Sequence, residues 1–254
     1  MKNILLIISV VLMMSCNDRV EFRSECLPST LQDGVIAFYP FNNGSLLDES
    51  SNSNDLTNTS TATPAPDRSG NIKCAYQFDA SDEAQEFLST KSTNFLNSLE
   101  SFSISIWYEP IDTSRSVGDF EVLVSRGNEG HCPDRRGEWS VGLFDCRRAV
   151  FGHDNSVWAD SQNGCQGEVI ALTNRWHHVV ATKNGNEYRI YFNGILNEVE
   201  IGNANCLNQY IAQDIGDFFI GTDYTGKIDD VIIFNRELNQ TEVGELYTLE
   251  PCCG

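Results

Sequence analysis

Basic residues are scarce in this sequence. Its 254 residues include 17 Lys and Arg against 36 Asp and Glu, which gives a formal net charge of −19. An anionic surface repels phosphate backbones and anionic lipid headgroups, so the composition disfavours nucleic-acid binding and peripheral docking to membranes. Hydrophobic residues make up 41% of the chain, which is enough for a packed core.

Long hydrophobic runs and several reactive motifs are also missing. The longest apolar stretch, Ile4–Met14, is too short for a transmembrane helix. The chain lacks the paired CxxC spacing of zinc sites, the Gly-x-Ser-x-Gly and His-Glu-x-x-His motifs, and a phosphate-binding glycine loop. The Glu-x-Asp-x-x-Glu arrangement of carboxylates that serves glycoside hydrolysis is absent too. These absences favour a protein that is not an enzyme.

The first sixteen residues have the pattern of an export signal. Lys2 precedes the apolar run, and the small residue Ser15 precedes Cys16, which resembles the lipobox of bacterial lipoproteins. We therefore expect a signal peptide over 1–15, a lipidated Cys16 with a tether over 16–33, and one domain over 34–254. The protein would be exported and lipid-anchored in the bacterial cell envelope, at the outer membrane, touching the membrane only through its anchor. An ordinary secretory signal with an incidental cysteine is the alternative.

The sequence contains nine cysteines, and eight remain once Cys16 is set aside as the lipidation site. Outside the cytosol, that number predicts up to four disulfides, although 105 pairings are possible and the connectivity stays open. Adjacent cysteines rarely bond each other, so Cys252 and Cys253 are each expected to reach a different partner, with Cys26 as one candidate. The eight disulfide candidates are Cys26, Cys74, Cys132, Cys146, Cys165, Cys206, Cys252 and Cys253.

Short runs of alternating polarity dominate the rest of the chain. In Ser101–Glu109, the residues Phe102, Ile104, Ile106 and Tyr108 share one face, which predicts a half-buried strand. Asn-Gly pairs at 184–185 and 193–194 predict tight turns, and Asn239 with Glu242 predicts a capped C-terminal helix. Further strand-like runs predict an all-β sandwich; they are 121–124, 139–144, 176–182, 188–192, 217–220 and 228–234.

Seven segments, taken together and in order, resemble the laminin-G-like or concanavalin-A-like family, which includes the pentraxins. The resemblance implies an all-β, two-sheet antiparallel jelly-roll sandwich with a concave face and, here, a short C-terminal helix. Two features depart from the family pattern: Ser51 replaces a usual glycine, and the cysteine-bearing segment 127–170 is long. The segments are Val35–Phe41, Asp48–Asn54, Ala75–Asp79, Phe102–Trp107, Trp176–Val180, Tyr191–Gly194 and Gly226–Arg236.

The same resemblance implies a structural calcium ion. Calcium prefers several carboxylate and carbonyl oxygens, and family members often hold it between an early loop and an Asp that opens a late strand. Carried over, this gives Asp48 and Asp229 as ligands, with Asn54 as a weaker one. The alternative is that the aspartates only solvate the entry of a strand.

Two sets of residues are candidates for ligand binding. Trp107 lies opposite the apolar stripe of its strand, and Arg189 and Tyr191 alternate in a similar way, so the three could line a groove on a concave sheet. The alternative is that other segments cover them. Five arginines lie in 126–148, and Arg135 and Arg136 could meet an anionic glycan or an acidic protein patch. The alternative is pairing with nearby acids, namely Glu129, Asp134, Glu138 and Asp145.

These patterns predict a non-catalytic recognition domain in a cell-envelope lipoprotein, which binds carbohydrate or adheres to a surface protein. Because fold does not fix function, two alternatives stay open. One is a glycan-processing enzyme or an accessory subunit of one. The other is a structural envelope protein. The pair His177 and His178 is expected to pack and to form hydrogen bonds rather than to bind metal or react.

Overall fold

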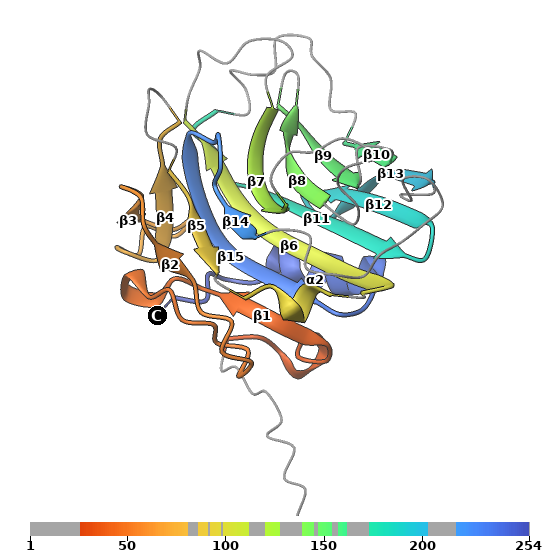
Figure 1. Cartoon of the computed structure of the whole chain (residues 1–254), viewed down its shortest axis with the longest axis horizontal. Coiled ribbons are helices and arrows are strands. Elements are labelled where there is room, and N and C mark those ends of the chain that lie inside the picture. Colours follow the sequence, from red (N-terminus) through yellow and green to blue (C-terminus); the bar gives the residue numbers. More distant parts are fainter. Residues whose placement is uncertain are drawn as a thin grey trace, which may run out of the picture.

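The structure is a computed structural model. It describes residues 26–80, 86–90, 92–97, 99–111, 120–127, 139–144, 147–153, 157–161, 173–202 and 217–253. Its strands form two antiparallel sheets, as the sequence predicted, and a short helix lies near the C-terminus (Figure 1). Within the described residues, no helix combines the length and the apolar character that crossing a membrane requires. Residues 1–25, including Cys16, lie outside the described part, so the signal peptide, lipidation and domain limits stay predictions.

Sheet A contains the strands that the sequence showed most clearly. In order across the sheet they are β13 (Ile195–Ile201), β12 (Glu187–Phe192), β11 (His177–Asn184), β6 (Ser101–Pro110), β15 (Gly226–Phe234), β4 (Ala75–Phe78) and β3 (Thr63–Ala65), and β1 (Val35–Tyr39) also pairs with β15. The predicted turns are present: Gly185 follows β11, and Asn193 with Gly194 joins β12 to β13. All three residues have positive φ, as such hairpin turns require.

Sheet B packs against sheet A and is built from shorter strands. In order they are β10 (Val157–Asp160), β9 (Arg148–His153), β8 (Trp139–Phe144), β7 (Phe120–Arg126), β14 (Phe218–Ile220), β5 (Leu88–Thr90) and β2 (Thr57–Asn58). Among the described residues, single-turn 3-10 helices are η1 (Ser29–Leu31), η2 (Asn42–Gly44) and η3 (Asn94–Leu96).

The main core lies between the two sheets. Phe102, Ile104, Ile106 and Tyr108 of β6 all belong to it, which confirms the alternation read from the sequence. Each strand of a sandwich alternates between this core and the outside, so the residues that flank a core residue along its strand mark the outer face. The two outer faces differ in what covers them.

The outer face of sheet A is covered by a second hydrophobic layer. Helix α2 (Gln240–Thr248) places Val243 and Leu246 against it, and Leu27 and Leu31 join from the N-terminal segment. In Figure 1, α2 lies behind the strands of sheet A. The helix begins with a capping box in which Asn239 accepts hydrogen bonds from the amides of Thr241 and Glu242. This confirms the predicted helix.

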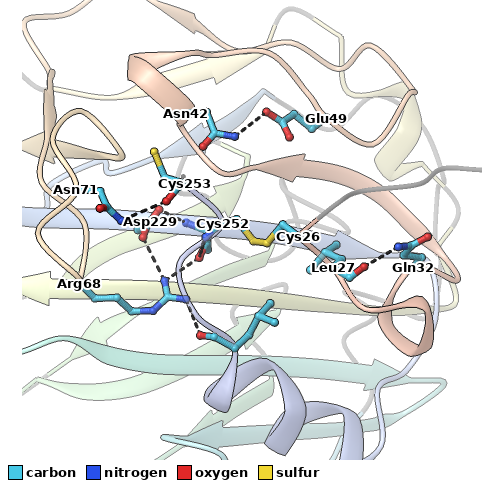
Figure 2. Close-up of a disulfide and its surroundings, with 12 residues drawn as sticks. Cys26, Leu27, Gln32, Asn42, Glu49, Arg68, Asn71, Asp229, Cys252 and Cys253 are labelled. Atoms are coloured by element: carbon cyan, nitrogen blue, oxygen red, sulfur yellow. Dashed lines mark hydrogen bonds and ion pairs between the residues drawn. A yellow bond between two sulfur atoms is a disulfide. The ribbon is translucent and has the colours of Figure 1, made fainter.

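Two disulfides fasten the C-terminal segment to the domain. Cys252 bonds Cys26 (Figure 2). Cys253 bonds Cys74. The two adjacent cysteines therefore have different partners, and Cys26 is one of them, as predicted. The other candidates, Cys132, Cys146, Cys165 and Cys206, lie outside the described residues, so their pairing stays a prediction.

Candidate functional site

Trp107 does not form an open platform. The side chain is 8% exposed and lies on the outer face of sheet A, where Tyr247 of α2 stacks on it at 5.7 Å between ring centroids. His178 stacks at 4.9 Å, and the guanidinium of Arg68 lies 4.4 Å from the ring centroid. The structure contradicts the prediction that Trp107 binds a sugar, because the helix that follows β15 covers the face to which its strand directs it.

The two other groove candidates are also engaged. Tyr191 is 3% exposed and belongs to the hydrophobic layer under α2. Arg189 forms ion pairs with Glu187 and Glu237, which hold its guanidinium at the surface. The predicted groove of Trp107, Arg189 and Tyr191 is therefore wrong as an open site, although all three do lie on the outer face of one sheet.

The Asp pair in the middle of the last strand, β15, binds an arginine. Nη1 of Arg68 lies 3.2 Å from Oδ2 of Asp229 and 2.7 Å from Oδ2 of Asp230, and Nη2 donates to the carbonyl of Leu249 at 2.9 Å (Figure 2). Burial raises the pKa of both aspartates, and Asp230 raises that of Asp229 further, while Arg68 lowers both. Asp230 has a positive φ of 43° at an irregularity in the β15–β6 pairing, which turns both carboxylates toward Arg68.

Asp48 and Asn54 brace the loop between β1 and β2. Asp48 accepts hydrogen bonds from the amides of Phe38 at 3.0 Å, Ser50 at 2.9 Å and Asn54 at 2.9 Å. Nδ2 of Asn54 donates to the carbonyl of Ile36 at 2.9 Å. The carboxylate of Asp48 thus accepts hydrogen bonds from backbone amides, and that of Asp229 pairs with the guanidinium of Arg68. The oxygens that the predicted calcium site would use are therefore already engaged with other groups. The described residues also contain no group of three or more His, Cys, Asp or Glu placed to hold a metal. Calcium binding stays a prediction without support from this geometry.

His178 packs as predicted and is neutral. Its Nε2 lies 2.8 Å from Oγ of Ser105, and its backbone amide donates to Oδ1 of Asn193 at 2.9 Å. Burial, with a smaller effect of the Arg68 charge, lowers the pKa of His178 to about 3. The ring therefore stays uncharged at neutral pH and cannot act as a general base in water-exposed chemistry.

We expect His178 to make the protein sensitive to acid. Its pKa is about 3 in the folded state and 6.5 in the unfolded chain, so between these values the unfolded state binds one more proton. The free energy of unfolding should fall by about 1.4 kcal/mol per pH unit as the pH drops through this window. Urea unfolding of the wild type and of His178→Gln at a series of pH values measures the difference, because the carboxylates titrate in both. Parallel pH profiles would contradict the prediction.

The arginines of segment 126–148 that the structure describes are engaged within the chain; Arg126 and Arg147 are buried, and Arg148 is partly exposed. Arg126 donates from Nη1 to the carbonyl of Leu96 at 2.5 Å, and Nε of Arg147 lies 3.4 Å from Oε1 of the buried Glu121. Arg148 pairs with Asp160 at 2.9 Å. Pairing within the chain is thus confirmed for Arg147 and Arg148, but with other acids than those expected. Arg135, Arg136 and the four expected acids lie outside the described residues, so the ligand role of Arg135 and Arg136 stays a prediction.

The outer face of sheet B carries an aromatic cluster that the sequence did not reveal. Phe120, Phe144 and Trp158 come from β7, β8 and β10, with ring centroids 5.4 Å apart for Phe144–Trp158 and 5.8 Å for Phe120–Trp158. We call these three residues the aromatic triad. Phe120 and Phe144 are half-buried, whereas Trp158 is 38% exposed. Among the aromatic side chains in the described strands of sheet B, Trp158 is the one that is exposed.

Two glycines let rings of the triad approach the sheet closely. A Cβ on Gly152 would meet the Trp158 ring at 3.3 Å, and one on Gly142 would meet the Phe120 ring at 3.0 Å and the carbonyl of Glu121 at 2.3 Å. Glycine inside a strand often marks a close approach of this kind. Gly142 lies in a run that the sequence analysis identified as a strand, so this signal was present. A glycine within a strand predicts a close contact at that position. It does not predict which residue makes the contact, because that depends on how the strands pair.

Comparison with known proteins places this fold. A family model described as "Concanavalin A-like lectin/glucanases superfamily" matches residues 82–244, which is more than half of the chain. The chain belongs to this superfamily. The resemblance seen in the sequence is thereby confirmed. No curated protein matches the chain significantly.

Solved structures of similar fold have low sequence identity to this member of the concanavalin A-like superfamily. Domain 4 of a GH43 extracellular arabinanase from Geobacillus stearothermophilus, in complex with arabinotriose, has 16% identity and a TM-score of 0.60, with 84% of this chain and 98% of that chain covered. The binding domain of Paraclostridial Mosquitocidal Protein 1 has 15% identity and a TM-score of 0.62, with 84% and 52% covered. A structure of botulinum neurotoxin type C, whose cell entry depends on two ganglioside molecules, has 17% identity and a TM-score of 0.64, with 87% and 52% covered. The chain spans about half the length of both toxin chains.

Proposed function

We propose that this protein is a non-catalytic domain that binds carbohydrate through the aromatic triad on sheet B. The observation that carries the proposal is the exposed Trp158 ring, which Phe120 and Phe144 hold and which lies against Gly152. A fixed, partly exposed aromatic ring offers an apolar surface to the C–H face of a sugar, and neighbouring polar groups orient its hydroxyls. The ion pair of Arg148 and Asp160 supplies such groups on the adjacent strands.

Three further observations support the proposal. The solved arabinanase domain of similar fold is in complex with a trisaccharide, and the toxin structure is connected with gangliosides. The sequence lacks the motif of paired carboxylates that glycoside hydrolysis in this type of fold uses. The export signal predicted over residues 1–15 fits a protein that meets glycans outside the cytosol. We include anchoring through Cys16 in the bacterial cell envelope as part of the same proposal.

A glycan array tests this function directly. The protein with its disulfides intact should bind at least one glycan class. Trp158→Ala should lower the affinity for that glycan about tenfold, because about 1.4 kcal/mol of aromatic contact is lost. Trp176→Ala is the matched control, since Trp176 is half-buried and directly precedes β11 of sheet A. A silent array would overturn the proposal, and so would equal losses in the two variants.

A further inference from the structure

Strand β13 is an open edge of sheet A. It pairs with β12 on one side, and among the described strands none pairs with it on the other (Figure 1). It has seven residues and contains neither lysine nor proline, the residues with which proteins commonly protect such edges. Its backbone is therefore available to an added strand.

The other outer strands in the described part of the chain are short or capped. At the opposite end of sheet A, β3 has three residues and contains Pro64. At the ends of sheet B, β2 has two residues, and the amide of Asp160 on β10 donates to the carboxylate of Glu198. On β1, the amide of Phe38 donates to Asp48 of the neighbouring loop. The long, uncapped edge of β13 is thus an exception.

The ladder between β12 and β13 decides which backbone groups point to the open edge. Its pairing is regular over residues 198–201. The amide of Gly202 donates to the carbonyl of Asn186, and hydrogen-bonded and non-bonded pairs alternate along an antiparallel ladder. Glu200 therefore bonds β12, whereas the N–H and C=O groups of Val199 and Ile201 point away from it. These two residues offer donors and acceptors to an added strand.

Exposed apolar side chains gather on the same strand. Of the eight large hydrophobic side chains that are exposed in the described residues, four belong to β13; Ile195, Leu196, Val199 and Ile201 are 67%, 39%, 44% and 68% exposed. Val199 lies opposite Arg189 in the ladder, so Val199 and Ile201 share the outer face of sheet A. A concentration of apolar surface of this kind is typical of a contact site for another protein.

The charges beside β13 favour a basic partner. Glu200 lies between Val199 and Ile201, is half-buried, and has no side-chain partner among the described residues. The cations of the two neighbouring strands are engaged, Arg189 with two glutamates and Lys183 with a backbone carbonyl. A lysine or arginine opposite Glu200 would therefore supply an ion pair that these strands do not.

We propose that β13 binds an extended segment of another protein, which adds to sheet A as a further strand and carries a basic residue between two apolar ones. The apolar residues lie opposite Val199 and Ile201, and the basic residue lies opposite Glu200. Backbone hydrogen bonds supply affinity in this mode of recognition, and the alternating side chains supply specificity. The inference does not rest on the proposed function, because it uses no residue of the aromatic triad.

A second copy of the chain fits this edge less well. A two-fold pairing of β13 centred on Val199 brings Glu198 of one copy opposite Glu200 of the other, and a pairing centred on Glu200 brings the two Glu200 side chains together. Like charges that lie directly opposite each other destabilise a sheet, and the net charge of −19 adds to the repulsion between copies. The charges thus favour a foreign basic segment.

Synthetic peptides test the proposal. Fluorescence anisotropy at physiological ionic strength compares three labelled peptides of equal length: alternating lysine and valine, alternating glutamate and valine, and the first peptide with every valine N-methylated. We expect the first peptide alone to bind, because the second has the wrong charge and the third cannot donate hydrogen bonds to the edge. Hydrogen exchange followed by NMR should show fast exchange at Val199 and Ile201 in the free protein and protection of both amides in the complex.

Two protein variants locate the site. Val199→Pro removes an N–H that points away from β12, so the ladder keeps its bonds while the edge loses a donor. This variant should lower the affinity for the lysine peptide about tenfold, with a melting temperature close to that of the wild type. Glu200→Lys should lower the affinity about three- to tenfold. Glu250→Lys makes the same charge change at an exposed residue beyond α2 and should leave the affinity unchanged.

Four outcomes would overturn the proposal. The first is no binding of the lysine peptide, and the second is equal binding of its N-methylated form. The third is an equal loss in Glu200→Lys and Glu250→Lys, which would mean attraction to the acidic surface as a whole. The fourth is a dimer in sedimentation that Val199→Pro abolishes, because it would assign the edge to a second copy. If Val199→Pro failed to fold, the exchange of the Val199 and Ile201 amides in the wild type would still decide the question.

Discussion

Replacing Arg68 by methionine is expected to lower the free energy of unfolding by about 3–5 kcal/mol, because the change leaves two buried carboxylates without their cation. Asp229 and Asp230 are 1% and 4% exposed, and the Arg68 side chain is itself only 10% exposed. The same substitution removes the hydrogen bond to the carbonyl of Leu249, which helps to hold the end of α2. Urea unfolding monitored by tryptophan fluorescence measures the loss.

Two variants show whether the charge is the cause. Arg189→Met removes an arginine whose ion pairs are more exposed, so it should cost less than about 1 kcal/mol. Adding Asp229→Asn and Asp230→Asn to the Arg68→Met protein removes the uncompensated charges and should restore part of the stability. If Arg68→Met and Arg189→Met proved equally mild, Arg68 would not be the charge that stabilises this site.

Loss of either disulfide is expected to have a comparable effect. Cys26 and Cys252 are 226 residues apart in the chain, and Cys74 and Cys253 are 179 apart. In the chain-entropy description, closing a loop of this length in the unfolded state stabilises the folded state by about 5 kcal/mol. For a domain of this size, that corresponds to a fall in melting temperature of about 10–20 °C.

Paired substitutions avoid leaving a reactive free cysteine. Cys26→Ser with Cys252→Ser removes one bond, and Cys74→Ser with Cys253→Ser removes the other, so thermal melts of these two proteins and of the wild type compare the bonds directly. Because the two loops overlap, removing both bonds should cost less than the sum of the two effects. Peptide mapping without reductant must link Cys252 to Cys26 and Cys253 to Cys74; any other linkage contradicts the structure.

Local patterns in the sequence predicted most of sheet A. The alternation along β6 gave the correct inward residues. The runs at 176–182 and 188–192, with the Asn-Gly pair between them, predicted β11 and β12, because hairpins and alternation are encoded within a few residues. The capping box at Asn239 likewise predicted α2. Strands β2, β3, β5, β9, β10 and β13 were not predicted; each is at most seven residues long, and the sequence of each shows too short an alternation to stand out.

The candidate site was harder to predict because it depends on contacts between distant segments. Alternation shows that Trp107 points away from the core, but it does not show that Tyr247 and Arg68 will cover the ring. For Trp158 the reverse holds, because the sequence around it predicted neither a strand nor a binding site. The pairing of β10 with β9 places its ring over Gly152 and beside Phe144.

The bond between Cys26 and Cys252 also decides how the domain responds to mechanical force. A pull applied between chain positions before residue 26 and after residue 252 passes through this one covalent link, since the bond connects the two points at which the chain enters and leaves the fold. Neither sheet then bears the force, and the chain between Cys26 and Cys252 is not stretched. In single-molecule stretching, the chain between Cys26 and Cys252 therefore does not extend until a reductant opens that bond. The bond between Cys74 and Cys253 then still closes the chain between residues 74 and 253, so the strands from β4 to β15 extend only after this second bond is reduced as well.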